Sequence, residues 1–213
     1  MLSKEVYLII GICGLIGSGK NTAAEIVAKE YDYIQTSMAA PLKDMTAVAF
    51  GWPRYLLEGD TKESREFREK QDDFWSDRLG RPWSPRIALQ FLGTELFRQK
   101  LNDDFWVHAL EQRMNPNKNY VIADVRFPNE IEMILRSGGK IWLVERGPRP
   151  EWWEAAEKTN TDHNDPKDHM RTHYPQIHYS EWAWIGTKFH LTIDNNGDLV
   201  SLYKQIKHAM ESK

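Results

Sequence analysis

Short apolar runs alternate along the chain with amphipathic stretches. Five of these runs predict buried strands, at residues 6–13, 33–36, 120–123, 140–144 and 190–193. Stretches with helical spacing of apolar positions separate them, at 21–31, 41–50, 85–100, 104–114, 128–137 and 199–210. Strands that alternate with helices predict an α/β fold, a three-layer αβα sandwich around about five parallel strands.

Two stretches depart from this alternation. Residues 51–85 are mostly charged and aromatic, and the segment TKESREFREKQDD at 61–73 predicts an exposed helix. Residues 147–184 are rich in Pro, His, Asn, Asp and Trp and show little periodicity. We therefore expect one domain, residues 1–213, with a helical insertion at about 51–85 and a lid-like excursion at about 147–184.

Composition narrows the class of protein. The net charge of −3 gives no general attraction for nucleic acid or anionic membranes. The single cysteine, Cys13, fits a reducing compartment, and the apolar run at 6–13 is too short to span a bilayer. We expect a cytoplasmic protein with no membrane partner, and the charge disfavours a nucleic-acid partner. Aromatic residues in polar contexts leave a homodimer open.

The turn after the first predicted strand is rich in glycine. Residues 14–20 read GLIGSGK and match the pattern G-x-x-x-x-G-K, between a predicted strand and a predicted helix. Glycines let successive backbone N–H groups point at phosphate oxygens, and the positive end of the following helix dipole adds to this attraction. We predict that Gly14, Gly17, Ser18, Gly19 and Lys20 bind the phosphates of a nucleoside triphosphate.

The position after Lys20 departs from the usual pattern. Asn21 stands where a serine or threonine normally binds Mg²⁺, and Thr22 follows it. An amide oxygen is an acceptable ligand for Mg²⁺, directly or through water. We predict that Asn21 takes part in the metal site and that Thr22 bonds an inner phosphate.

A second polar group follows the strand predicted at 120–123. Asp124 and Arg126 stand at its carboxyl end, where parallel sheets bind their ligands. A carboxylate there can hold Mg²⁺ or accept a proton, and a guanidinium can offset the charge of a transferring phosphate. A purely structural Asp–Arg pair is the less favoured alternative.

A third group lies on the helix predicted at 85–100. Arg86, Gln90, Thr94 and Glu95 follow near-helical spacing, and Arg98 lies one turn beyond Thr94, so that the polar stripe has a cation at each end. From spacing alone, a solvated helix face explains this stripe equally well. Lys43, just after the strand predicted at 33–36, adds another cation near the same edge of the sheet.

The ordered set of these segments resembles the phage-type deoxynucleoside monophosphate kinase family of P-loop kinases. The matching segments are GLIGSGKNT, APLKD, RIALQFLGTELFR with DDFWV, VIADVRFPNE, GGKIWLVERGP, HYSE and TIDNNGDLVSLYKQI. They cover most of the chain apart from about 51–83 and 148–175. The resemblance implies transfer of the γ-phosphate of ATP, with Mg²⁺, to a small-molecule deoxynucleoside 5′-monophosphate.

The resemblance also implies roles for individual residues. ATP would bind residues 14–22 and Arg146, with Asn21 and Asp124 at the metal. The monophosphate acceptor would face Lys43, Arg86, Gln90, Thr94 and Arg98, and the insertion at 51–85 would belong to its site. Glu181, grouped with His178 and Ser180, would close the substrate side. The catalytic set would be Lys20, Asp124, Arg126 and Arg86.

Other interpretations remain open at this stage. The protein could phosphorylate a modified base hydroxyl within DNA, or bind nucleotide without catalysis. The histidines and carboxylates of residues 162–178 include sound zinc ligands, but their spacing favours a solvated loop. Trp52, Phe74, Trp75 and Trp83 are candidates to stack on the base of the acceptor.

Overall fold

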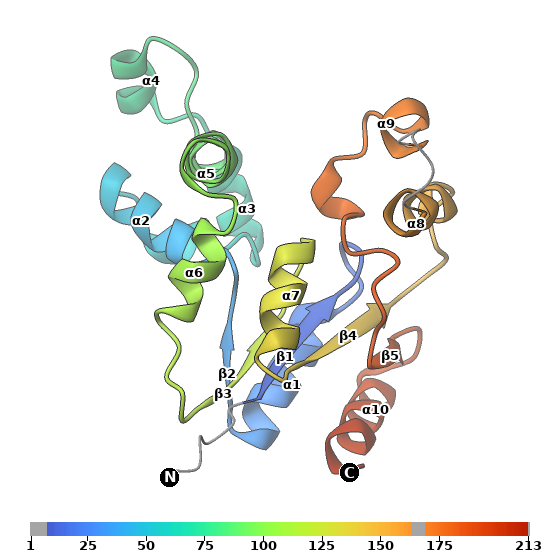
Figure 1. Cartoon of the computed structure of the whole chain (residues 1–213). Coiled ribbons are helices and arrows are strands. Elements are labelled where there is room, and N and C mark those ends of the chain that lie inside the picture. Colours follow the sequence, from blue (N-terminus) through green and yellow to red (C-terminus); the bar gives the residue numbers. More distant parts are fainter. Residues whose placement is uncertain (1–7, 163–168, 213) are drawn as a thin grey trace. The chain divides into compact units, whose positions relative to one another are not determined.

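The computed structural model describes residues 8–162 and 169–212 (Figure 1). This described chain divides into two compact units. The first contains the residues up to 37 and those from 115 onward, and the second is Met38–Met114. The second unit covers more residues than the insertion expected at 51–85. The organisation as a single domain remains a prediction.

A five-stranded parallel sheet forms the centre of the first unit. Its strands are β1 (Ile9–Cys13), β2 (Tyr33–Thr36), β3 (Asn119–Ile122), β4 (Lys140–Glu145) and β5 (Leu191–Asp194). Their order is β2-β3-β1-β4-β5, with Gly11 of β1 opposite Ile122 of β3 and Ile141 of β4. The expected α/β class and its five parallel strands are confirmed.

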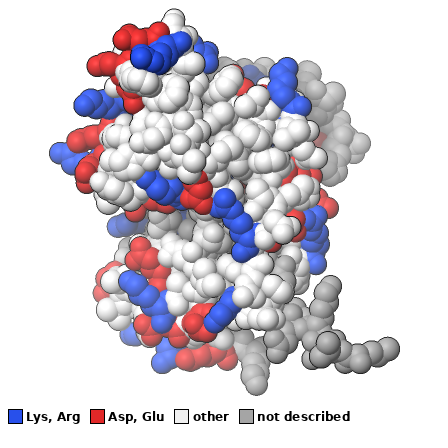
Figure 2. Space-filling model, turned by 90° about the vertical axis from the view of Figure 1, so that its left-hand side faces the viewer, with Lys and Arg blue, Asp and Glu red and all other residues white. Residues whose placement is uncertain are grey.

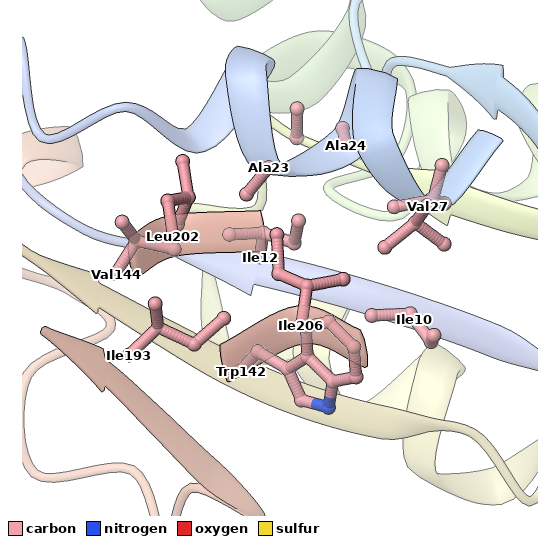
Figure 3. Packing of buried hydrophobic residues seen from close by; sticks show 12 residues of the cluster. Ile10, Ile12, Ala23, Ala24, Val27, Trp142, Val144, Ile193, Leu202 and Ile206 are labelled. Atoms are coloured by element: carbon pink, nitrogen blue, oxygen red, sulfur yellow. The ribbon is translucent and has the colours of Figure 1, made fainter. Parts of the chain in front are cut away.

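Helices cover both faces of this sheet. On one face, α1 (Lys20–Tyr31) and α10 (Leu199–Glu211) pack on alternate apolar residues of the strands (Figure 3). Val27 of α1 and Ile206 of α10, for example, belong to one buried cluster with Trp142 of β4. On the other face, α7 (Pro128–Arg136) packs against β1 and β4, with Ile134 beside Gly11.

After two neighbouring parallel strands, the chain continues on opposite faces of the sheet. β1 and β3 lie side by side, but α1 follows β1 on one face and α7 follows β3 on the other. Open parallel sheets bind ligands beyond the strand ends at such a divergence. The glycine-rich loop after β1 and residues 124–126 after β3 flank this position.

The second unit is helical among its described residues. Its elements are α2 (Ala40–Phe50), η1 (Arg54–Leu57), α3 (Lys62–Glu69), α4 (Asp73–Leu79), α5 (Pro85–Gln90), η2 (Phe91–Leu101) and α6 (Phe105–Glu111). The single helix expected over 61–73 is wrong. α3 ends at Glu69, and Asp72 caps a separate helix by accepting a hydrogen bond from the Trp75 N–H at 3.0 Å.

The helix expected over 85–100 forms, but it changes type along its length. α5 is α-helical and η2 is a π-helix, whose backbone bonds run from residue i to i+5. The Gly93 carbonyl within η2 accepts a hydrogen bond from the Trp106 indole N–H at 2.9 Å. A side chain that bonds into a helix ladder is a recognised cause of such distortion.

Residues 147–184 contain more regular structure than their lack of periodicity indicates. They form α8 (Trp153–Thr161), α9 (His169–His173) and the short helix η3 (Tyr179–Glu181). Trp153 and Trp184 pack edge to face with ring centroids 5.5 Å apart, and Asn160 donates to the backbone carbonyls of Trp182 and Ile185. Contacts between widely spaced aromatic residues stabilise this segment, so its sequence has no continuous apolar stripe that would predict the helices.

Two expectations from the sequence concern a metal site and membrane-spanning helices. Among the described residues, no group of three or more His, Cys, Asp and Glu side chains is arranged to hold a metal ion. His163, Asp165 and Asp168 lie outside the described residues. No helix within residues 8–162 and 169–212 is long and apolar enough to cross a membrane.

We predict that Gly11→Ala strongly destabilises the first unit. A Cβ at this position would lie 2.5 Å from Ile134 Cδ1 and 3.0 Å from Ile141 Cδ1. Overpacking of this kind costs about 1–3 kcal/mol. Chemical denaturation should show that loss, whereas Val200→Ala on the exposed side of α10 should leave the midpoint nearly unchanged. A Gly11→Ala protein as stable as the wild type would contradict the packing described for β1.

Candidate active site

The glycine-rich loop depends on glycine for two different reasons. Gly14, Gly17 and Gly19 all have positive φ angles, of 148°, 79° and 99°. A Cβ on Gly14 would lie 2.4 Å from the Val144 carbonyl oxygen. A Cβ on Gly17, by contrast, would meet nothing within 4 Å. Gly17 therefore borders open space, where a ligand can approach the backbone.

A residue from the far end of the chain fixes this loop. The Asn195 Nδ2 group, just after β5, donates to the Ser18 carbonyl oxygen at 2.7 Å. It is so close that a Cβ on Gly19 would lie 2.2 Å from it. Sequence reasoning missed Asn195, because no short pattern connects the segment at 195–197 to the glycine-rich loop. The contact joins residues 177 positions apart in the chain.

Lys20 begins α1 and turns back into the loop. Its ammonium donates to the carbonyl oxygens of Gly14 at 2.8 Å and Leu15 at 2.7 Å. Burial, and next the positive charge of Arg126, lower the pKa of Lys20 from 10.5 to about 8. No acidic residue lies in the first turn of α1, so its N-terminus keeps its preference for anions.

The expected neighbours of Lys20 come together around it. Arg126 lowers its pKa, whereas Glu181, Cys13 and Asp124 act in the opposite direction. Arg126 Nη1 donates to Glu181 Oε1 at 2.8 Å, and the Ser180 hydroxyl lies 3.4 Å from the same nitrogen. The ends of β1 and β3 and the helix η3 thus bring two cations and two carboxylates into one electrostatic cluster.

A buried carboxylate holds the backbone of Arg126. Glu130 is 2% exposed, and its Oε2 accepts the N–H groups of Arg126 at 2.7 Å and Phe127 at 3.1 Å. Sequence reasoning missed this role of Glu130. The signal is present in RFPNE, since Pro128 opens a helix and a glutamate at its third position can reach back to the preceding N–H groups.

His178 and Ser180, expected to close the site together with Glu181, contact each other at the start of the short helix that carries Glu181. His178 Nδ1 lies 2.8 Å from the Ser180 hydroxyl and accepts the Ser180 N–H at 3.3 Å. These contacts form the first turn of η3, which carries Glu181. His178 and Ser180 therefore fix the position from which Glu181 reaches Arg126.

Arg146 and Arg149 follow β4 on the same unit. Arg146 is exposed and lines a pocket with Leu15, Ser18 and Trp153. Arg149 pairs with Glu145 at 2.9 Å and covers the Trp153 ring at 4.4 Å from its centroid. Arg146, which is predicted to bind ATP, therefore lines a pocket together with two residues of the glycine-rich loop.

The two residues predicted to hold a metal offer suitable ligands. Asn21 lies exposed in the first turn of α1 beside Thr22, and Asp124 acts on the charge of Lys20. Amide and carboxylate oxygens are the hard ligands that Mg²⁺ takes, alongside water and phosphate oxygens. The donor set therefore fits Mg²⁺ bound together with a triphosphate.

The predicted acceptor residues lie on the second unit. Lys43 pairs with Glu58 at 2.6 Å, Arg86 pairs with Glu69, and Arg98 lies 3.6 Å from Asp103. Gln90 and Thr94 are exposed on α5 and η2. Their roles in binding remain predictions.

Two of the four candidates for base stacking are buried in the core of the second unit. Trp52 is 7% exposed and Trp83 is 3% exposed, and both pack in one cluster with Phe50 and Phe91. That expectation is wrong for these two residues, because the polar segments around them conceal a compact aromatic core. Phe74 is 55% exposed, with the Arg78 guanidinium 4.0 Å from the centroid of its ring, and its stacking role remains a prediction.

The loop, the lysine at the start of α1 and the parallel sheet define a P-loop nucleotide-binding protein. Comparison with known proteins narrows this class. The model of the deoxynucleotide monophosphate kinase family matches residues 57–157. A candidate deoxynucleotide monophosphate kinase of Acanthamoeba polyphaga mimivirus is 31% identical to this chain, over 65% of the chain and 74% of that protein. The chain belongs to the deoxynucleotide monophosphate kinase family.

Two further similarities are more distant. A deoxynucleoside-5′-monophosphate kinase of Escherichia phage T5 is 26% identical, over 60% of this chain and 71% of that protein. The crystal structure of TT1252 from Thermus thermophilus covers 96% of both chains, with 16% identity and a TM-score of 0.43. That structural similarity is too low to bear on function.

We predict that Lys20 loses its proton near pH 8 in the free protein. Because its pKa is lower in the folded than in the unfolded chain, this group makes folding more favourable as the pH rises from about 8 to 10.5. Competitive acetylation with mass spectrometry should show Lys20 becoming reactive near pH 8 in the folded protein and only near pH 10.5 in the denatured protein. Identical titration of Lys20 in the folded and denatured protein would contradict its burial.

Proposed function

We propose that this protein transfers the γ-phosphate of ATP to the 5′-phosphate of a deoxynucleoside monophosphate. The observation that carries the proposal is the cluster of Lys20, Arg126, Asp124 and Glu181 around the glycine-rich loop. A protein that only senses a nucleotide does not need a second cation held beside the loop lysine. The family to which the chain belongs supports the same class of acceptor.

The mechanism that we infer is electrostatic. In phosphoryl transfer, negative charge spreads over the transferring group, and catalysis consists of positioning the reactants and offsetting this charge. The Lys20 ammonium would leave the carbonyls of Gly14 and Leu15 for the outer phosphates. Arg126 would exchange part of its bond to Glu181 for a phosphate oxygen. Bound Mg²⁺, held by Asn21 and Asp124, would neutralise further charge.

The acceptor needs binding more than activation. A phosphate monoester is largely ionised at neutral pH, since its second pKa is about 6, so transfer to it needs no strong general base. Lys43, Arg86, Gln90, Thr94 and Arg98 would bind this acceptor, with the two arginines and the lysine supplying charge. Arg86 is half exposed in its pair with Glu69, so it can exchange that carboxylate for a phosphate.

The net charge of −3 gives no general attraction for a nucleic-acid acceptor. On the one face drawn in Figure 2, Lys and Arg side chains intersperse with Asp and Glu side chains. A duplex would require a continuous basic groove to offset its closely spaced phosphates. A small-molecule acceptor requires only a local cluster of cations.

We predict that the wild-type protein forms ADP from ATP and Mg²⁺ in the presence of at least one deoxynucleoside monophosphate. A panel of the four monophosphates, with duplex DNA and no acceptor as parallel reactions, tests this. Lys20→Ala should lower kcat by at least about 100-fold, because it removes a charge aimed at the transition state. Lys29→Ala, on the exposed face of α1, is the matched control. Transfer to DNA alone, or no transfer by a folded wild-type protein that binds ATP, would reject the proposal.

We predict that Arg86→Ala weakens acceptor binding selectively. Loss of a charge-assisted hydrogen bond of about 1.5–3 kcal/mol should raise the KM for the monophosphate about 10- to 100-fold. The KM for ATP should stay within about twofold, since Lys20 and the loop are unchanged. Arg65→Ala is the control, because Arg65 is exposed on α3 and bonds the Asp60 carbonyl. An unchanged acceptor KM would remove Arg86 from the site.

A further inference from the structure

Lys43, which is predicted to bind the acceptor, is the first of five charged side chains that contact one another in series in the second unit. The Lys43 ammonium contacts Glu58 Oε2 at 2.6 Å, and the other oxygen of Glu58 accepts a hydrogen bond from Arg54. Arg54 also donates to Asp44 at 2.5 Å, and Asp44 in turn accepts a hydrogen bond from Arg113 at 2.5 Å. Each carboxylate therefore bridges two cations.

These five residues come from separate parts of the second unit. Lys43 and Asp44 lie in the first turns of α2, Arg54 opens η1, and Glu58 follows η1 directly. Arg113 lies two residues beyond the end of α6. The network thus fixes the start of α2 against η1 and the end of α6.

The environment of Lys43 differs from that of an ordinary surface ion pair. Its side chain is 12% exposed, compared with 87% for Lys62 in its pair with Glu66. Partial burial acts to raise the pKa of the Glu58 carboxyl, but Lys43 and Arg54 hold it below its usual value. Glu58 therefore stays charged and keeps a largely buried ammonium in one place.

We propose that Glu58 is a positioning residue for the acceptor nucleotide: it holds the Lys43 ammonium in place, and Arg54, Asp44 and Arg113 hold Glu58. This proposal rests on the proposed function. A lysine side chain is flexible, so an unrestrained Lys43 would lose freedom each time it bound a phosphate. An ammonium has three N–H donors, so Lys43 can keep Glu58 and still donate to a phosphate oxygen.

Arg54 has a definite place in this arrangement. A carboxylate beside a phosphate site repels the incoming anion. Because Arg54 contacts both Glu58 and Asp44, it offsets part of their charge and leaves the chain of three cations and two carboxylates with a net positive charge. The carboxylate can then position Lys43 without excluding the acceptor.

The test is a double-mutant cycle between Glu58 and Lys43, read as separate KM values. Glu58→Gln keeps the shape of the side chain but removes its charge, and should raise the acceptor KM at least about tenfold, with the KM for ATP within about twofold. In a Lys43→Met background, Glu58→Gln should have little further effect, because the group that it positions is gone. Glu66→Gln is the matched control on the exposed pair with Lys62.

Each outcome decides a different point. Wild-type protein that phosphorylates no monophosphate rejects the function, and this proposal with it. An active wild type with an unchanged acceptor KM in Glu58→Gln, or an equal rise in the Lys43→Met background, overturns the positioning role alone and indicates general support of the fold. If Glu58→Gln does not fold, Glu58→Asp keeps the charge but shortens its reach, and should raise the acceptor KM without changing the KM for ATP.

Discussion

The burial of the Lys20 ammonium beside a second cation is the constraint on which the rest of the site depends. The proposed function needs a charged Lys20, yet burial and the positive charge of Arg126 lower the pKa of Lys20. Glu181 offsets part of this charge by pairing with Arg126, and the carbonyl oxygens of Gly14 and Leu15 accept hydrogen bonds from the Lys20 ammonium. The free protein thus holds both cations on acceptors of its own chain. In the proposed function, phosphate oxygens of a bound nucleotide would take the place of these acceptors.

Residues distant in the sequence maintain this balance. Asn195 holds the loop through the Ser18 carbonyl, and Glu130 holds the backbone of Arg126. Neither of them is expected to touch a substrate. They matter because the interaction of a charge with its partners depends on the distance between them, so a displacement of about 1 Å changes it. The geometry of the cluster therefore depends on two contacts, made by Asn195 just after β5 and by Glu130 in the first turn of α7.

Sequence patterns predict the parts of this molecule that local chemistry determines. The loop at 14–20, the five strands and the position of Asp124 after β3 follow from short runs of residues whose spacing has few alternatives. Asn195 and Glu58 could not be found in this way, because their roles depend on partners far along the chain or in another element. The division at Glu69, the π-helix of η2 and the helices α8 and α9 were also missed. In each of these, a specific tertiary contact or cap outweighs the periodic pattern.

In each unit, cations of the candidate site pair with carboxylates. Lys43 is held by Glu58 and Arg86 by Glu69, as Arg126 is held by Glu181. The pairs differ in exposure, and exposure determines what each can do. The Arg86 pair is open to solvent on both sides, so exchange of its carboxylate for a phosphate costs little. Lys43 is largely buried, so removal of Glu58 would leave an ammonium without a counter-charge. The exposed Arg86–Glu69 pair therefore suits exchange for a phosphate, whereas Lys43, 12% exposed beside a Glu58 that is 38% exposed, suits a lasting pairing.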